Sequence, residues 1–182
     1  MNKCLLLLLF AISFSCLAPD EINISVDTDT VIMDQLLKSS IAPQEHYQIK
    51  KEVTLDGEQE VVILSFDTLI LIKDLKSITE SSFARLIRST NYNKTKIEKG
   101  WLYERKIKEK KGPVSVSFIQ DDDVRSALKV RFKDKNLLYE SDKKIELIFE
   151  KERLSQYQIS GSRKLVGMRL SSYSIKATIV QP

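Results

Sequence analysis

Residues 128–133 read Leu-Lys-Val-Arg-Phe-Lys, so apolar side chains alternate there with basic ones. Residues 145–150, Ile-Glu-Leu-Ile-Phe-Glu, repeat this spacing with acidic partners. Successive side chains of a β-strand point to opposite faces of the sheet. This spacing therefore gives each strand one buried face and one solvent-exposed face. The two stretches therefore predict an antiparallel sheet that packs one face against a core.

The same alternation continues on both sides of these stretches. It recurs at Ile22–Val26, Trp101–Ile107, Val114–Phe118 and Tyr173–Ile179. Tyr47–Leu55 and Glu60–Phe66 flank Asp56-Gly57, the dipeptide of a tight hairpin turn in which both central residues take positive φ. We expect a further short strand at Leu69–Ile72.

Two segments favour helices. Asp29 or Thr30 can cap a helix that runs through Ser39, with Ile32, Leu36 and Leu37 on one face. Ser77-Ile78-Thr79-Glu80 has the capping-box pattern and predicts a helix to about Ser89. Together the patterns predict an α+β fold, an antiparallel sheet of roughly six to eight strands with one or two packed helices.

The start of the chain has the order of a secretory signal. Lys3 precedes an unbroken apolar run from Leu5 to Phe14, and the small residues Ser13 and Ser15 follow its core. The run is about half the ~20 residues that a membrane-spanning helix needs. We therefore expect a signal peptide at residues 1–15, a tether at 16–21 and a single β-rich globular domain at 22–182.

The end of this leader resembles the lipobox of bacterial lipoproteins. Phe14-Ser15-Cys16 follows the leucine run, and Ser15 fits the small residue that precedes the lipidated cysteine. Ser13 and Phe14 depart from the usual order of an aliphatic residue and then a small one. An ordinary signal peptidase would favour the same bond, because it also reads Ser13 and Ser15.

The resemblance implies that Cys16 carries acyl chains such as palmitate and anchors the protein in a membrane. It implies a place in the cell envelope, at the outer membrane or the cell surface. Apart from Cys16, the only cysteine is Cys4 inside the leader, so the remaining chain has no internal disulfide.

Charge is distributed unevenly along the chain. Residues 17–74 hold 4 Lys/Arg and 12 Asp/Glu, whereas residues 75–182 hold 24 and 13. The steepest cationic excess is at residues 85–111, with 10 basic and 3 acidic residues around aromatic rings. The candidate ligand-binding residues of this basic stretch are Arg85, Arg88, Trp101, Tyr103, Arg105, Lys106, Lys108, Lys110 and Lys111.

Cations beside stacking rings suit an anionic polymer. For an exported protein we expect anionic glycan, lipopolysaccharide or lipid headgroups, or a protein partner, rather than nucleic acid. The structural alternative is that Trp101 and Tyr103 face the core. Lys106, Lys108 and Lys110 would then form the wet face of a strand and discourage edge pairing.

The chain is poor in catalytic residue types. It has one histidine, His46, which we interpret as structural, and five glycines with no phosphate-binding loop. Asp121-Asp122-Asp123 is a dense carboxylate run, as are Asp27 and Asp29 on a smaller scale, but neither has the spacing of a calcium loop. We expect no metal, no cofactor and no catalytic residue.

The sequence thus favours a non-enzymatic envelope lipoprotein that acts as a binding or scaffolding module. A membrane- or polyanion-binding module that uses residues 85–111 is the alternative. A secreted enzyme of unknown class is the third possibility.

Overall fold

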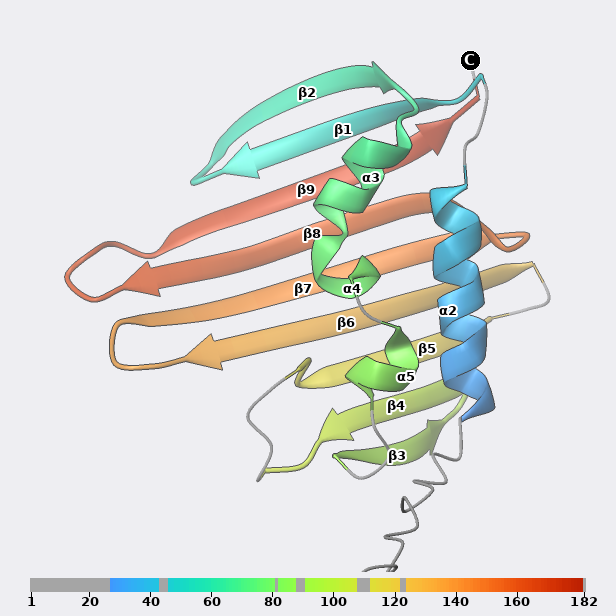
Figure 1. The fold of residues 1–182 in the computed structure, drawn as a ribbon. Helices are drawn as coiled ribbons and strands as arrows, with labels where there is room; N and C mark the ends of the chain where they lie inside the picture. The colour runs from blue at the N-terminus through green and yellow to red at the C-terminus, as the bar shows by residue number, and fades with distance from the viewer. Residues whose placement is uncertain are drawn as a thin grey trace, which may run out of the picture.

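The computed structural model describes residues 27–42, 46–80, 82–87, 91–107, 112–121 and 124–181. The signal peptide, the tether with Cys16, and the strand expected at Ile22–Val26 lie outside these residues. Figure 1 shows the described part as one large sheet with helices laid across it.

The sheet has nine antiparallel strands in the order β2-β1-β9-β8-β7-β6-β5-β4-β3. Strands β3 to β9 form an up-and-down meander, and the β1–β2 hairpin joins it because β1 pairs with β9. The strands are β1 (Gln48–Leu55), β2 (Glu58–Ser65), β3 (Tyr92–Ile97), β4 (Gly100–Arg105), β5 (Ser115–Gln120), β6 (Arg125–Lys135), β7 (Tyr139–Glu150), β8 (Arg153–Leu165) and β9 (Ser171–Val180).

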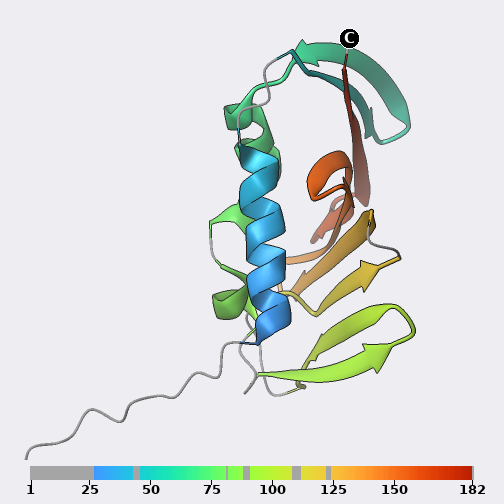
Figure 2. The ribbon, with the colours of Figure 1, turned by 90° about the vertical axis from the view of Figure 1, so that its right-hand side faces the viewer.

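Four helices lie on one face of the sheet, with α2 running across the strands (Figure 2). They are α2 (Thr28–Ile41), α3 (Thr68–Asp74), α4 (Lys76–Thr79) and α5 (Phe83–Leu86). The prediction of a mainly antiparallel sheet with packed helices is confirmed. The strands and helices are more numerous than we expected.

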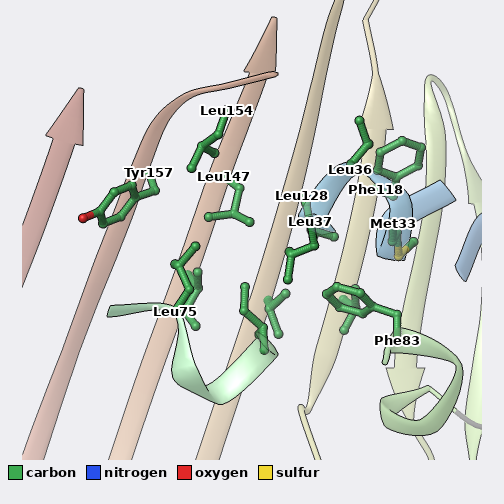
Figure 3. Close-up of a cluster of buried hydrophobic side chains, with 14 of the residues drawn as sticks. Met33, Leu36, Leu37, Leu75, Phe83, Phe118, Leu128, Leu147, Leu154 and Tyr157 are labelled. Atoms are coloured by element: carbon green, nitrogen blue, oxygen red, sulfur yellow. The ribbon is translucent and has the colours of Figure 1, made fainter. Parts of the chain in front are cut away.

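The alternating residues form the core, as the period of two requires. Leu128, Leu147 and Tyr157 are register partners on β6, β7 and β8, and all three side chains are buried. From the helical side, Met33 and Phe83 pack onto this face (Figure 3). Burial of aliphatic and aromatic surface at about 25 cal/mol per Å² is the main stabilising contribution to such a two-layer arrangement.

The hairpin between β1 and β2 is confirmed at its turn. Asp56 has a φ of 49° and Gly57 a φ of 96°, which are the positive values that a two-residue turn of this type needs. Leu55 and Glu58 are paired across the turn.

Two predictions in the middle of the chain are wrong. Leu69–Ile72 lies in α3 instead of a strand, because Asp67 caps the helix by accepting a hydrogen bond from the Leu69 amide at 2.8 Å. The predicted capping box at Ser77 is absent, because Ser77 lies inside α4, whose N-cap is Leu75. Two short helices, α4 and α5, therefore stand where one helix was expected.

Helix α2 begins one turn earlier than we predicted. Asp27 is the N-cap, and its carboxylate accepts a hydrogen bond from the Asp29 amide. Leu36 and Leu37 are buried as expected, but Ile32 is 37% exposed and Met33 takes its place against the sheet. The buried face of α2 therefore contains Met33 in place of the predicted Ile32.

Truncation of a core residue tests the assignment of faces. Phe149 is fully buried on β7, so Phe149→Ala should lower the free energy of unfolding by about 3–5 kcal/mol in urea titration. Val61→Ala on the opposite face of β2, where Val61 is 50% exposed, should change it by less than about 0.5 kcal/mol. Equal losses in the two variants would contradict the assignment.

Candidate functional site

The candidate basic stretch is spread over α5, β3, β4 and the chain that follows β4. Arg85 is exposed on α5, and Lys106 is exposed just beyond the end of β4. The guanidinium of Arg105 donates a hydrogen bond to the Gly112 carbonyl at 2.9 Å. Arg88, Lys108, Lys110 and Lys111 lie outside the described residues.

The two aromatic candidates of the stretch, Trp101 and Tyr103, point toward the helix-covered face. Tyr103 is 3% exposed and belongs to the core, and Trp101 is half-buried and packs against it. The Lys94 ammonium lies 4.2 Å from the centroid of the Trp101 ring, a cation–π distance. The ring faces on which a ligand would stack therefore already contact other residues of the protein.

A charged cluster joins these rings to the start of α2. Lys94 forms an ion pair with Asp27 at 2.8 Å and another with Asp29. The Tyr103 hydroxyl donates to the Asp27 carboxylate at 2.9 Å. Helix α2 is thereby fastened to β3 and β4, at the end of the sheet farthest from β1 and β2.

Each charge in the α2 cluster favours the ionised form of its partner. Burial raises the pKa of Asp27, but the hydrogen bonds from Lys94 and Tyr103 outweigh this effect and hold the pKa below its usual value. Burial likewise lowers the pKa of Lys94, and the two carboxylates more than reverse the shift. Lys94 and Asp27 are therefore held as an ion pair at neutral pH.

A second cluster connects α3 with the centre of the sheet. Lys51 of β1 forms an ion pair with Asp74 at 2.7 Å, and both side chains are largely buried. The Tyr157 hydroxyl donates to the same carboxylate at 2.6 Å. Burial, together with this contact, raises the pKa of Tyr157 and keeps the phenol protonated.

A third contact has the composition of a serine–lysine hydrolase pair. The Lys143 ammonium on β7 donates to the Ser77 hydroxyl on α4. Burial lowers the pKa of Lys143, and the charge of Asp74 partly offsets this. A lysine with a depressed pKa beside a hydroxyl can act as a general base. Here the pair lies between the helical layer and the sheet.

An open groove lies on the other face of the sheet. It has a volume of about 420 Å³ and is bordered by the charged pair Asp142 and Lys144. Most of its other lining side chains are hydroxyls, namely those of Thr54, Ser160, Ser162, Ser172 and Ser174. A smaller groove of about 240 Å³ shares Lys144. Neither groove contains Ser77 or Lys143.

The remaining candidates have simple surroundings. His46 is exposed, with a φ of 68°, just before β1. Asp121 forms an ion pair with Lys99, while Asp122 and Asp123 lie outside the described residues. Within the described residues, no group of three or more His, Cys, Asp or Glu side chains could hold a metal ion. No helix in this part of the chain is long and apolar enough to cross a membrane.

Sequence reasoning missed the partners in all three clusters. The pairs Asp27–Tyr103, Asp74–Tyr157 and Ser77–Lys143 are separated by 76, 83 and 66 residues. Alternation places Tyr103 and Tyr157 on the core side of their strands, yet it does not say which helix residue meets each hydroxyl. The local signal was the Asp27-Thr28-Asp29 start of α2, which marks a helix N-terminus.

No protein-family model, curated protein or solved structure matches this chain.

Charge removal at Asp27 tests the energetic role of the α2 cluster. Asn caps helices as well as Asp does, so Asp27→Asn should lose mainly the ion pair and destabilise the protein by about 1–2 kcal/mol at neutral pH. The folded-state pKa of Asp27 is below the unfolded value of about 3.9, so the stabilisation is present above that value and lost as the pH falls through the folded pKa. Urea titrations at about pH 7 and pH 3 measure the difference.

Asp67→Asn is the matched control for this experiment. Asp67 is also an N-cap that accepts a hydrogen bond from an amide two residues on, and it forms no ion pair among the described residues. We expect it to change stability by less than about 0.5 kcal/mol. A deficit in Asp27→Asn that persists undiminished at low pH would show that the charge of Asp27 contributes nothing.

Proposed function

We propose that this chain is a non-enzymatic cell-envelope lipoprotein, anchored through Cys16, whose β-rich domain acts as a binding or scaffolding module. The observation that carries the proposal is where the polar side chains converge. All three clusters of Lys, Asp, Ser and Tyr described above lie between a helix and the sheet.

An enzyme needs reactive groups that converge on a space which a substrate can enter. The Tyr103 and Tyr157 hydroxyls are both occupied by carboxylates of the helical layer. The open grooves instead lie on the outer face of the sheet and are bordered mostly by serines and ion-paired residues. Hydroxyls on a flat surface suit recognition of a partner better than catalysis.

The Lys143–Ser77 contact is the arrangement closest to a catalytic pair. Its position between α4 and β7 gives it the same role as the Lys51–Asp74 ion pair, which is to hold the short helices on the sheet. These three polar contacts hold the helical layer against the sheet in the described part of the chain. A two-layer domain held in this way suits a scaffold.

The lipobox-like leader supplies the anchoring half of the proposal. Helix α2 is capped at Asp27, so ten residues lie between the cap and Cys16, which are 11 residue steps apart. A fully extended chain of this length spans at most about 40 Å. A lipid on Cys16 would therefore keep the domain within about 40 Å of the bilayer.

Fatty-acid labelling tests the anchor. Radiolabelled palmitate should enter the wild-type protein in the bacterium that makes it and should not enter Cys16→Ser. The variant should also move to the aqueous phase of a detergent partition, because a chain without acyl groups has lost its membrane-soluble part.

Cys4→Ser is the matched control, since Cys4 is the only other cysteine and lies within the leader. It should be labelled as strongly as the wild type. Equal partition of wild type and Cys16→Ser would reduce the proposal to a protein that is secreted without an anchor.

A further inference from the structure

Exposed apolar side chains gather where three hairpins turn, at one end of the strands. Strands β1–β2, β6–β7 and β8–β9 turn at this end, on the left in Figure 1 and beyond the helices. We call the turns Leu55–Glu58, Asn136–Leu138 and Val166–Leu170 the hairpin edge. Its exposed apolar residues are Leu55 (55%), Leu137 (95%), Leu138 (72%), Val166 (71%), Met168 (63%) and Leu170 (61%).

This clustering is unusual for a surface in contact with water. Single exposed apolar residues need no explanation, but a contiguous group marks an interaction surface. Turns are also the segments in which polar residues and glycine are expected. Leu137 and Leu138 follow Asn136, and Val166 and Met168 flank Gly167, so turn chemistry alone leaves these four apolar side chains unexplained.

Hydrogen bonds hold the three turns to one another. The Val166 amide donates to the Leu138 carbonyl at 3.0 Å, which links β8–β9 with β6–β7. The Asp56 amide donates to the Ser172 carbonyl at 2.9 Å, and the Asp56 carboxylate accepts from the Ser172 amide at 2.6 Å. The apolar side chains are therefore presented together, with little ordering left to occur on binding.

Cations flank the β8–β9 turn of the hairpin edge. The β8–β9 turn is flanked by Arg163, Lys164 and Arg169, all exposed, and no acidic residue occurs from Leu154 to the end of the chain. Lys164 and Arg169 form no ion pair among the described residues.

Three carboxylates at or beside the hairpin edge have local partners, whereas the exposed Glu58 forms no ion pair among the described residues. Asp56 accepts from Ser171 and Ser172, and Asp134 accepts from the Tyr139 hydroxyl. Glu140 pairs with Lys135 at 3.1 Å. Glu140 is the register partner of Lys164, but its carboxylate lies within ion-pair distance of Lys135 and Lys133 and not of Lys164.

We infer that the hairpin edge docks into an anionic lipid bilayer. The apolar turns would enter the boundary between headgroups and acyl chains, while Arg163, Lys164 and Arg169 contact the phosphates. Adjacent turns with exposed apolar side chains suit a bilayer surface, because lipids can pack around them and need no complementary shape.

This inference rests on the proposed function, because a chain anchored at Cys16 would keep the edge near a membrane. Strand β7 has 12 residues and is about 40 Å long, so the width of the domain matches the reach of the chain between Cys16 and Asp27. The acyl anchor and the hairpin edge can therefore meet the same bilayer.

Vesicle binding by the unlipidated Cys16→Ser chain tests the edge separately from the anchor. The chain should float with vesicles of phosphatidylcholine and phosphatidylglycerol, and at least about tenfold less with phosphatidylcholine alone. Adding Leu137→Asp and Met168→Asp should weaken binding to the anionic vesicles by at least about tenfold. Lys164→Glu with Arg169→Glu should also weaken it and reduce its sensitivity to salt.

Val61→Asp with Ile63→Asp is the matched control, because these residues are 50% and 64% exposed on β2, away from the turns. This control should bind as the Cys16→Ser chain does, and equal melting temperatures show that each variant is folded. Absence of vesicle binding, or binding unaffected by Leu137→Asp and Met168→Asp, would overturn the inference. If the Cys16→Ser chain does not bind vesicles, the hairpin edge is better explained as a contact for a protein partner. Palmitate labelling tests the lipid anchor independently of that result.

Discussion

The apolar face of the nine-stranded sheet must be covered, and this requirement governs the rest of the structure. An antiparallel sheet with one face alternating into a core is stable only when another layer excludes water from that face. Helix α2 and the three short helices supply that layer, and Met33, Leu75 and Phe83 reach from it into the sheet. The ion pairs and hydrogen bonds at Asp27, Asp74 and Ser77 then fix where the layer lies.

This arrangement divides the surface of the domain by chemistry. The helix-covered face is used for packing, the outer face carries serines, lysines and their ion pairs, and one set of turns carries exposed leucine, valine and methionine. The groove of about 420 Å³ adjoins the hairpin edge, because its lining includes Thr54, which precedes Leu55, and Ser172, whose amide donates to Asp56 of the β1–β2 turn.

Strand positions could be predicted from the sequence because one face of the sheet is exposed to solvent. Apolar and polar residues therefore alternate along each strand, as they do around Leu128 and Ile145. The apolar run Leu69–Ile72 could not be assigned in this way, since four consecutive apolar residues fit a buried strand and a helix equally well. Its true state depended on Asp67 and on packing against the sheet. The charged clusters could not be predicted from the sequence, because each joins residues more than 60 positions apart. The hairpin edge was visible in principle, as apolar residues inside turn segments, but its three parts are adjacent only after folding.

The pairing of β1 with β9 has a consequence for the order in which the chain folds. Residues 48–55 find their partner at residues 173–180, so the contact closes a loop of more than a hundred residues. Contacts of such sequence separation form late and slow folding. A ribosome releases the N-terminal end first, and the inner edge of β1 must then wait unpaired until the last strand has emerged. During that interval the unpaired edge of β1 can pair with another chain, so we expect incomplete chains to be more prone to aggregation than the folded protein.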